Sequence, residues 1–317
     1  MIVAAKDGSG DFISLQEAID AAADGAEILV KPGLYEERVV AHRNDLRIVG
    51  EDPEKTVSTA RACAKDLHPD GTEKTTFLSA TFMTTGHGIT VENLTIRNDA
   101  GDGSVVGQAV AVYAAGDLGV WKNCRFIAHQ DTLYCGPLRI PDVIDDIAPR
   151  DGDAERFPLV QNGPFCRSRQ VFERCFIRGD VDFIFGSYRC WFEECTLFMN
   201  ARGGFYTAAN THWDQPVGLV FHRCLLTGEC APGQGLLGRP WRAGARTVFL
   251  DCEMDEHVAP EGFQDWDAER VVTDRCGEWH TRGERADQST RHPSQKRLTD
   301  AEASKLTRAY VLSGADS

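Results

Sequence analysis

The middle of the chain consists of short apolar runs rather than long amphipathic helices. These runs are rich in Val, Ile and Phe, are separated by Gly, Asn and Asp, and lie at 27–30, 46–49, 89–96, 109–113 and 119–127. This alternation of apolar runs with turn-forming residues is typical of short β-strands joined by turns. Ahead of the runs, Ser14 is followed three residues later by Glu17 and by apolar residues at helical spacing, which predicts a capping box and a helix to about Ala23.

The decisive pattern is an internal repeat of the form aromatic-x-x-Cys, followed by further apolar residues. Its copies are Trp121 to Cys124, Phe172 to Cys175, Phe192 to Cys195, Phe221 to Cys224 and Phe249 to Cys252. The segment that begins at Val91 and carries Asn93 resembles an earlier copy. Successive full copies start 51, 20, 29 and 28 residues apart. Intervals of this size indicate stacked coils rather than a sandwich or a helical bundle.

The repeat predicts an all-β fold, a parallel β-helix in which each coil pairs its strands with the coil above. We expect one domain over residues 1–317, with a solenoid core at 1–275 and a C-terminal loop and helix at 276–317. The N-terminal helix would cap one open end. The cysteines would form an inward ladder of small apolar side chains, with metal or redox chemistry as the functional alternative.

The C-terminal part of the sequence has a different character. Thr299 is followed by Glu302 in a second capping box, and Leu306 and Tyr310 continue at helical spacing. This pattern predicts one helix that packs back onto the solenoid. The polar, Arg-rich stretch 279–297 is expected to be a surface loop.

Two aspartates fall at the same place in their repeats. Asp131 lies seven residues after Cys124, and Asp182 lies seven residues after Cys175. If the 51-residue interval is one coil plus an excursion at 137–165, the two lie on adjacent coils about 4.8 Å apart. Carboxylates held that close are expected to titrate unequally, which supplies a protonated acid and a charged nucleophile. Spacing alone leaves open a structural role in which both aspartates cap turns.

Composition narrows the class of protein. The 317 residues carry a formal net charge of −14 without a prominent Lys or Arg run, which argues against a nucleic-acid or anionic-lipid partner. No stretch approaches the ~20 apolar residues that a membrane span needs. The 11 cysteines are odd in number and contain no C-x-x-C pair, and residues 1–23 show no signal-peptide pattern. We therefore expect a reducing compartment, the cytoplasm, with secretion as the alternative if the sequence is a processed form.

Other catalytic patterns are missing from the sequence. There is no Gly-x-Ser-x-Gly elbow for a serine esterase. The histidines show no H-E-x-x-H or H-x-x-x-H spacing, so we expect no metal site. His129, next to Gln130 and Asp131, is expected to orient or pack rather than to react.

At these residues the sequence resembles the pectin methylesterase family. Five segments look like the signature segments of that family in their expected order: Gly33-Leu-Tyr-Glu36, Gly107-Gln-Ala-Val-Ala111, His129-Gln-Asp-Thr-Leu-Tyr134, Gly179-Asp-Val-Asp-Phe-Ile-Phe-Gly186 and Leu237-Gly-Arg-Pro-Trp241. The resemblance covers roughly residues 1–275, and five ordered motifs are far more specific than one. It implies a right-handed parallel β-helix, no metal or organic cofactor, and hydrolysis of the methyl esters of pectin.

The resemblance also implies a role for five residues. Asp182 would be the nucleophile that attacks the ester carbonyl, and Asp131 would protonate departing methanol and then activate water. Arg239 would hold Asp182 ionised and aimed through a charge-assisted hydrogen bond. Gln108 and Gln130 would donate their amides to the developing oxyanion.

Three aromatic residues of the same motifs, Trp241, Phe185 and Tyr134, are expected to bind the substrate, with Trp241 as a platform for a sugar ring. The substrate would be methyl-esterified pectin or short methylated oligogalacturonides, bound by a monomeric enzyme. The excursion at 137–165 and the segment 277–284 depart from the family pattern, so the cleft walls they form do not carry over. The alternatives are a β-helical polygalacturonase or pectate lyase, and a carbohydrate-binding solenoid without catalysis.

Overall fold

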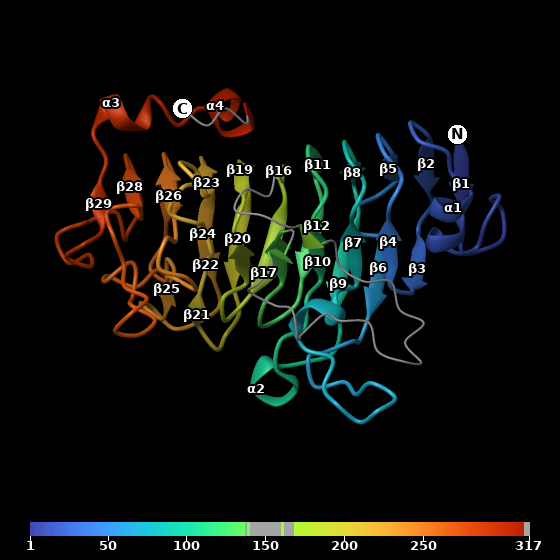
Figure 1. Ribbon diagram of the computed structural model, residues 1–317, viewed down its shortest axis with the longest axis horizontal. Helices are drawn as coiled ribbons and strands as arrows, with labels where there is room; N and C mark the ends of the chain where they lie inside the picture. The colour runs from blue at the N-terminus through green and yellow to red at the C-terminus, as the bar shows by residue number, and fades with distance from the viewer. Residues whose placement is uncertain (137, 140–159, 162–167, 314–317) are drawn as a thin grey trace.

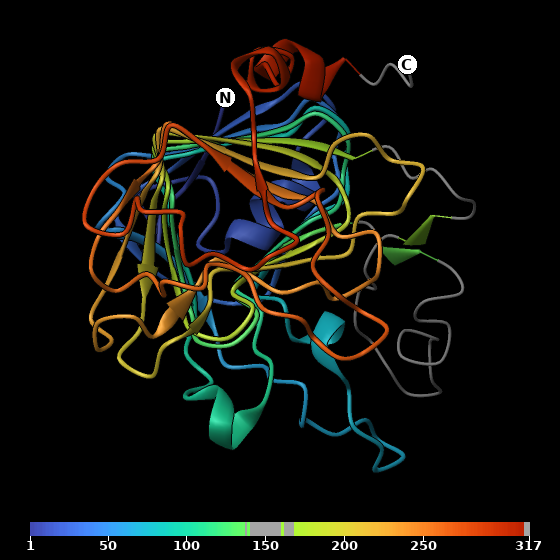
Figure 2. The same cartoon turned by 90° about the vertical axis from the view of Figure 1, so that its left-hand side faces the viewer.

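The computed structural model describes residues 1–136, 138–139, 160–161 and 168–313. Three long parallel sheets run along the molecule (Figure 1), and Figure 2 shows the coils stacked behind one another when viewed along the long axis. This is the right-handed parallel β-helix that the sequence predicted. Among the described residues, no helix is long and apolar enough to cross a membrane.

The first sheet has eleven strands in the described part of the chain. In order across the sheet they are β1 (Ile2–Ala4), β2 (Glu27–Val30), β5 (Arg47–Gly50), β8 (Thr90–Glu92), β11 (Gly119–Lys122), β16 (Arg169–Glu173), β19 (Arg189–Glu193), β23 (Leu219–His222), β26 (Thr247–Leu250), β28 (Gly277–Trp279) and β29 (Lys296–Arg297). Each pair of neighbours is parallel, as a coil-on-coil arrangement requires.

The second and third sheets follow the first in each coil. The second contains β3 (Gly33–Glu36), β6 (Thr56–Ala60), β9 (Thr95–Asn98), β12 (Arg125–Ile127), β17 (Phe176–Gly179), β20 (Thr196–Met199), β24 (Leu225–Gly228) and β27 (Glu253–Met254). The third contains β4 (Val39–Ala41), β7 (Phe82–Thr84), β10 (Val112–Ala114), β13 (Leu133–Cys135), β18 (Ile184–Gly186) and β22 (Thr207–Ala209). Each of the five apolar runs predicted from sequence overlaps at least one strand.

Two further pairs of strands lie outside these sheets. They are β14 (Leu138–Arg139) with β15 (Val160–Gln161), and β21 (Gly204–Phe205) with β25 (Gly235–Leu236). The predicted excursion at 137–165 lies largely outside the described residues. The 51-residue interval nevertheless spans one coil, because β11 pairs directly with β16 and β12 pairs directly with β17.

The turn from the first sheet into the second is a single residue with a left-handed backbone. It is the residue before each repeat cysteine, with φ between 50° and 54°: Asn123, Arg174, Glu194, Arg223 and Asp251. Such a backbone is costly for a residue other than glycine, so the paired strands on either side must enforce it. At the first of these turns, the Asn123 side chain donates to Asn93 Oδ1 of the preceding coil at 2.8 Å.

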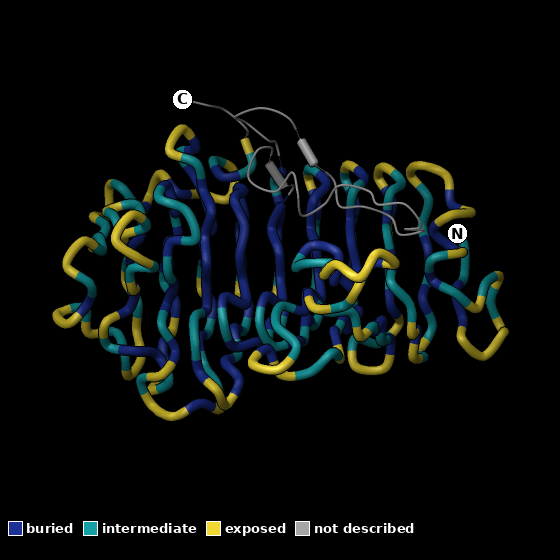
Figure 3. The backbone as a smooth tube through the Cα atoms, turned by 60° about the horizontal axis from the view of Figure 1, so that its bottom comes forward, coloured by how far each residue is buried: buried dark blue, intermediate teal, exposed yellow. Residues whose placement is uncertain are grey.

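The repeat residues form the core. The rings of Phe172, Phe192, Phe221 and Phe249 stack in sequence, with centroids 4.3 to 4.8 Å apart and planes within 16° of parallel. The five repeat cysteines are at most 1% exposed, and the ten described cysteines of the whole chain are all free. The inward cysteine ladder is therefore confirmed. Figure 3 shows the result: strands are buried, and the exposed residues gather at the turns.

The N-terminal helix covers the open end of the solenoid beside β1 and β2, as expected. This helix, α1 (Leu15–Ala21), ends two residues before the predicted Ala23. Ser14 caps it by accepting from the Glu17 backbone N–H at 3.2 Å. The carboxylate of Glu37, from the next turn of chain, accepts from the Ser14 hydroxyl and from the backbone N–H of Leu15. The Glu37 carboxylate thereby links the N-terminus of α1 to the coil that the helix covers.

The solenoid continues beyond residue 275, so the predicted boundary was wrong, whereas residues 280–295 do form a loop that is exposed or half-buried except at Arg291. Strands β28 and β29 add to the first sheet. Between them, Arg291 donates to the carboxylate of Glu278, with Nε to Oε1 at 2.7 Å, and the Glu278 side chain is fully buried. The sequence pattern does not reveal this pair, because it shows the charge of Glu278 and of Arg291 but not that both side chains are buried.

The C-terminal segment forms two short helices, α3 (Asp300–Ala303) and α4 (Arg308–Leu312), rather than the single helix predicted. The capping box of Thr299 and Glu302 is present. Thr307 then caps α4 separately, because its hydroxyl accepts from the Tyr310 backbone N–H. Both helices pack on the outer face of the first sheet, where Leu306 and Val311 join the apolar cluster (Figure 1).

Candidate active site

Asp131 and Asp182 occupy equivalent corners of neighbouring coils. Each lies between a strand of the second sheet and a strand of the third, and the strands that follow them pair as Leu133 with Ile184. The Asp131 backbone N–H donates to the carbonyl of Val181 at 3.1 Å. Both aspartates have a left-handed backbone, with φ of 65° and 54°. The prediction that they sit on adjacent coils is confirmed.

Arg239 binds Asp182 through two hydrogen bonds. Its Nε donates to Oδ1 at 2.8 Å and its Nη2 donates to Oδ2 at 2.7 Å. The guanidinium lies between the rings of Phe205 and Trp266, 4.1 and 3.9 Å from their centroids. A bidentate pair sandwiched in this way fixes both the position and the direction of the carboxylate.

Local sequence explains how Arg239 reaches this point. Its backbone N–H donates to the carbonyl of Thr207, at the start of β22. The preceding residue is Gly238, and a Cβ there would lie 2.1 Å from Thr207 Oγ1. Only glycine therefore lets the chain approach β22 closely enough to place the Arg239 side chain over Asp182.

Burial and charge give the two carboxyl groups different roles. Asp131 is 8% exposed and Asp182 is 5% exposed. Burial, followed by the charge of Asp182, raises the pKa of Asp131 well above its ordinary value. Burial also raises the pKa of Asp182, but the hydrogen bonds and charge of Arg239 oppose that rise. The proton shared by the pair therefore resides on Asp131, while Asp182 is the group stabilised as an anion.

The two glutamines line the same cleft, which has a volume of about 320 Å³. The Gln130 carbonyl accepts from the Ala109 backbone N–H at 3.2 Å, which joins the segments that carry Gln108 and Gln130. Gly103, at the start of α2 (Gly103–Val106), lies against Gln130, since a Cβ there would be 2.6 Å from Gln130 Cβ. The backbone thus presents both amides beside the aspartates. Asp131, Asp182, Arg239, Gln108 and Gln130 all meet in this one cleft.

Two of the three aromatic residues expected to bind the substrate line the cleft, and the third does not. Phe185 and Trp241 line the cleft, with ring centroids 5.9 Å apart. Tyr134 does not: it is 1% exposed and packs beneath the lining, 4.7 Å from Phe185 and 5.1 Å from Phe77 between centroids. It lies on β13, whose side chains are buried throughout. The structure therefore gives Tyr134 a supporting position rather than the surface position expected for substrate contact.

Several lining residues were missed from the sequence: Thr76, Phe77, Ala208, Arg242 and Trp266. The first two belong to the 3-10 helix η1 (Thr76–Ser79), in a segment with no strand pattern. Of these residues only Trp266 carries a signal in the sequence, because it is a large aromatic residue in a polar stretch. Their positions depend on loops that converge from different coils.

His129 lies beside the corner rather than in the lining of the cleft. Its Nδ1 is 3.0 Å from the buried carboxylate of Asp180, and this hydrogen bond raises the pKa of His129. The Asp180 backbone N–H in turn donates to the His129 carbonyl at 3.0 Å. These contacts tie together the two corners that carry the aspartates. Among the described residues, the chain brings together no group of three His, Cys, Asp or Glu side chains able to hold a metal ion.

Comparison with known proteins gives a consistent result. The family model described as pectinesterase matches residues 1–140 and 164–315. Pectinesterase 31 of Arabidopsis thaliana is 30% identical over 314 residues, covering 96% of this chain and 89% of that protein. The chain spans only 57% of another similar protein of that plant, probable pectinesterase/pectinesterase inhibitor 17, at 32% identity and with 98% of this chain covered.

Solved structures agree with the sequence relatives. Pectin methylesterase PemA from Erwinia chrysanthemi superposes with a TM-score of 0.79 at 28% identity, covering 99% of this chain and 97% of that one. The carrot enzyme gives 0.81 at 28% identity, covering 99% and 93%. A pectin methylesterase in complex with a hexasaccharide gives 0.78, also at 28% identity and with 99% and 97% covered. The chain belongs to the pectinesterase family and is a carboxylic ester hydrolase on a right-handed parallel β-helix.

Proposed function

We propose that this chain hydrolyses the methyl esters of pectic galacturonate, with Asp182 as the nucleophile and Asp131 as the acid and base. The observation that carries the proposal is the pairing of an Arg239-bound carboxylate with a second, protonated carboxyl group on the adjacent coil. One group is ready to attack, and the other is ready to give a proton. Membership of the pectinesterase family identifies an ester as the bond that is broken.

In the first step, Asp182 attacks the ester carbonyl carbon. Negative charge then develops on the carbonyl oxygen, and the side-chain amides of Gln108 and Gln130 are the neutral donors of the cleft that can stabilise it. Removal of one such donor typically costs about 3 kcal/mol. Asp131 transfers its proton to the methoxy oxygen as the C–O bond breaks, so that methanol leaves and an acyl-enzyme on Asp182 remains.

In the second step, Asp131 is ionised and acts as the base. It takes a proton from water, and the resulting hydroxide attacks the acyl carbon. The product leaves as galacturonic acid and gives its proton to solvent, Asp182 is restored as an anion held by Arg239, and Asp131 is again protonated. The protons and charges of the cycle therefore balance without a cofactor.

The aromatic rim of the cleft would orient the sugar. Trp241 is half-buried in the lining, and Phe185 packs against it. A sugar ring stacked on Trp241 would place its C6 ester toward the two carboxyl groups below. The hexasaccharide found with a similar pectin methylesterase supports an oligosaccharide ligand for this cleft.

Three finer statements belong to the same proposal. We propose that short methylated oligogalacturonides are preferred over the polymer, that the enzyme is cytoplasmic, and that it acts as a monomer. The net charge of −14 supports the first, because it disfavours long acidic chains. Buried, unpaired cysteines are compatible with the second.

Methanol release from highly methylated pectin and from short methylated oligogalacturonides tests the proposal. We expect methanol and acid in equal amounts from both, with higher kcat/KM on the short substrates. Products that absorb in the ultraviolet, formed without methanol, would instead indicate a lyase. Methanol from the polymer alone would remove the preference for short chains and leave the esterase mechanism standing.

A further inference from the structure

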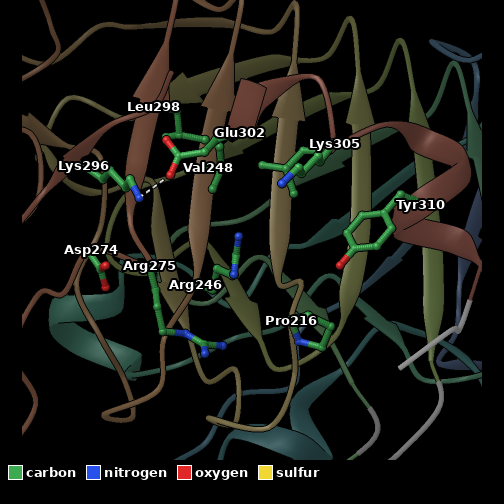
Figure 4. A pocket seen from close by; sticks show the side chains of 11 residues that line it. Pro216, Arg246, Val248, Asp274, Arg275, Lys296, Leu298, Glu302, Lys305 and Tyr310 are labelled. Atoms are coloured by element: carbon green, nitrogen blue, oxygen red, sulfur yellow. Dashed lines mark ion pairs between the residues drawn. The ribbon is translucent and has the colours of Figure 1, made fainter. Parts of the chain in front are cut away.

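A second cavity lies on the outer face of the first sheet, beneath α3 and α4, and shares no lining residue with the active-site cleft. Its volume is about 290 Å³. Figure 4 shows the Arg246 guanidinium at its centre, with Lys305 and Tyr310 on the side of the helices and Arg275 on the opposite side. The side chains come from three separate regions of sequence, so that the fold itself brings these cations together.

The cavity is basic in an acidic protein. Four cationic residues line it, Arg246, Arg275, Lys296 and Lys305, against the acidic residues Asp274 and Glu302. Lys296 and Glu302 neutralise each other, with Nζ and Oε1 2.5 Å apart. This leaves an excess of positive charge, whereas the whole chain carries −14. Such a local reversal of sign concentrates anions at the cavity.

In the described part of the chain, the remaining cations form no ion pair, although the charge of Asp274 acts on both arginines. Within the described residues, no carboxylate lies within 4.0 Å of the charged nitrogens of Arg246, Arg275 or Lys305. The Nε atoms of both arginines are buried without a hydrogen-bond partner. Burial lowers the pKa of Arg246, and burial together with the charge of Arg246 lowers the pKa of Arg275. Desolvated guanidinium groups in this state are stabilised by an incoming anion.

Backbone carbonyls fix the geometry of Arg275. It donates to the carbonyls of Trp213 at 3.0 Å, His212 at 3.1 Å and Gln215 at 2.6 Å. Its guanidinium also lies over the Trp213 ring, 5.3 Å from the centroid. These contacts hold the Arg275 side chain in place without neutralising its charge. The cation is therefore pre-positioned, which reduces the entropy lost when a ligand binds.

We propose that this cavity binds a small oxyanion, a carboxylate or phosphate group, through Arg246, Arg275 and Lys305, with the Tyr310 hydroxyl as an additional donor. Guanidinium groups suit the planar oxygens of carboxylates and the oxygens of phosphates. The volume lies at the lower end of the range of ligand pockets, which fits a single small anion or one sugar-acid unit. The proposal does not rest on the esterase mechanism.

Trp213 offers a way to distinguish the two sources of an oxyanion. It is 53% exposed and lies next to Arg275. An exposed indole gives apolar surface to a sugar ring but nothing to inorganic phosphate. Replacement of Trp213 by Ala removes this surface together with the ring beside Arg275, so it should weaken binding of a sugar acid much more than binding of phosphate.

Titration calorimetry and thermal unfolding in Tris buffer, with sodium phosphate or sodium galacturonate as the probe, test the proposal. Sodium chloride at matched ionic strength controls for screening. We compare the wild type with Arg246→Gln, Lys305→Gln and Trp213→Ala. Lys305 is exposed, so its variant is expected to fold. Arg282→Gln is the matched control, since Arg282 is 61% exposed and lies outside the cavity.

We expect saturable binding and a raised Tm with at least one probe, at least tenfold weaker binding by Arg246→Gln and Lys305→Gln, and no change for Arg282→Gln. Binding of galacturonate that depends on Trp213 would identify a sugar-acid site, and binding of phosphate alone would identify an inorganic-anion site. The proposal is overturned if the wild type binds neither probe, or if Arg246→Gln and Lys305→Gln bind as tightly as the wild type. Neither result bears on methanol release.

Discussion

Asp131 and Asp182 lie at the same corner of two successive coils, and only Asp182 is bound by Arg239. Strand pairing brings the two carboxyl groups together, while the arginine makes them unequal. Arg239 comes from a later coil, so its contact with Asp182 depends on the whole stack being in register. The fold supplies proximity, and a single side chain stabilises one carboxyl group as an anion and leaves the proton on the other.

Arg239→Gln should move the acid limb of the kcat/KM profile to higher pH. The hydrogen bonds and charge of Arg239 oppose the effect of burial on the pKa of Asp182, so without them that pKa rises and less of the nucleophile is ionised at a given pH. A profile of methanol release against pH measures the shift. Arg242→Gln is the control, because Arg242 lines the cleft without a hydrogen bond to Asp182. An acid limb unmoved in Arg239→Gln would contradict the role given to Arg239.

Asp131→Asn should abolish most activity yet stabilise the fold at neutral pH. Burial and the charge of Asp182 raise the pKa of Asp131, so the folded chain holds this proton more tightly than the unfolded chain does. Stability due to this group is present below the unfolded pKa of about 4 and is lost as the pH rises toward the raised folded pKa. The gain in Tm should therefore be small near pH 4 and grow toward neutrality. A gain that does not depend on pH would count against the shift.

Gly103→Ala should reduce kcat by up to roughly 10²-fold and should also cost about 1–3 kcal/mol of stability, because the new Cβ crowds the Cβ of Gln130. The added Cβ would meet Gln130, whose side chain must then move from the cleft. Initial rates of methanol release measure the effect. Gln130→Ala provides the reference, and the double variant should be no slower than Gln130→Ala alone. Additive losses would show that Gly103 acts by another route.

Arg291→Gln should destabilise the C-terminal coils by about 3–5 kcal/mol, because it leaves the buried Glu278 carboxylate without its cation. Denaturant unfolding measures the change. The double variant with Glu278→Gln should recover much of the loss, since it removes the uncompensated charge. Equal stability of Arg291→Gln and the wild type would show that the pair contributes nothing.

The sequence predicted the solenoid and the aspartate pair for the same reason. Asp131 and Asp182 each lie seven residues after a repeat cysteine. Because successive coils are in register, equal spacing along the chain places both residues at the same point of neighbouring coils. Core cysteines and the ladder of aromatic rings follow from the same rule. Features that repeat with the coil are therefore readable from sequence.

Features that depend on contacts between distant loops were not readable. Trp266 and Phe77 enter the cleft from non-repeating segments, and no period marks them. Tyr134 shares a motif with Asp131. Because side chains alternate in direction along β13, however, its ring packs beneath Phe185. The sequence around Glu278 and Arg291 is typical of a solvated charged stretch, because it shows each charge but not that the two side chains pair.

Methanol release by Asp182→Ala and Asp182→Asn, beside the wild type, tests the central claim most directly. Asn tolerates the left-handed backbone of this position, so it guards against a loss due to misfolding. With circular dichroism and thermal unfolding showing folded protein, we predict a loss of roughly 10⁴-fold or more in both variants. Methanol release equal to that of the wild type, in either folded variant, would contradict the assignment of Asp182 as the nucleophile.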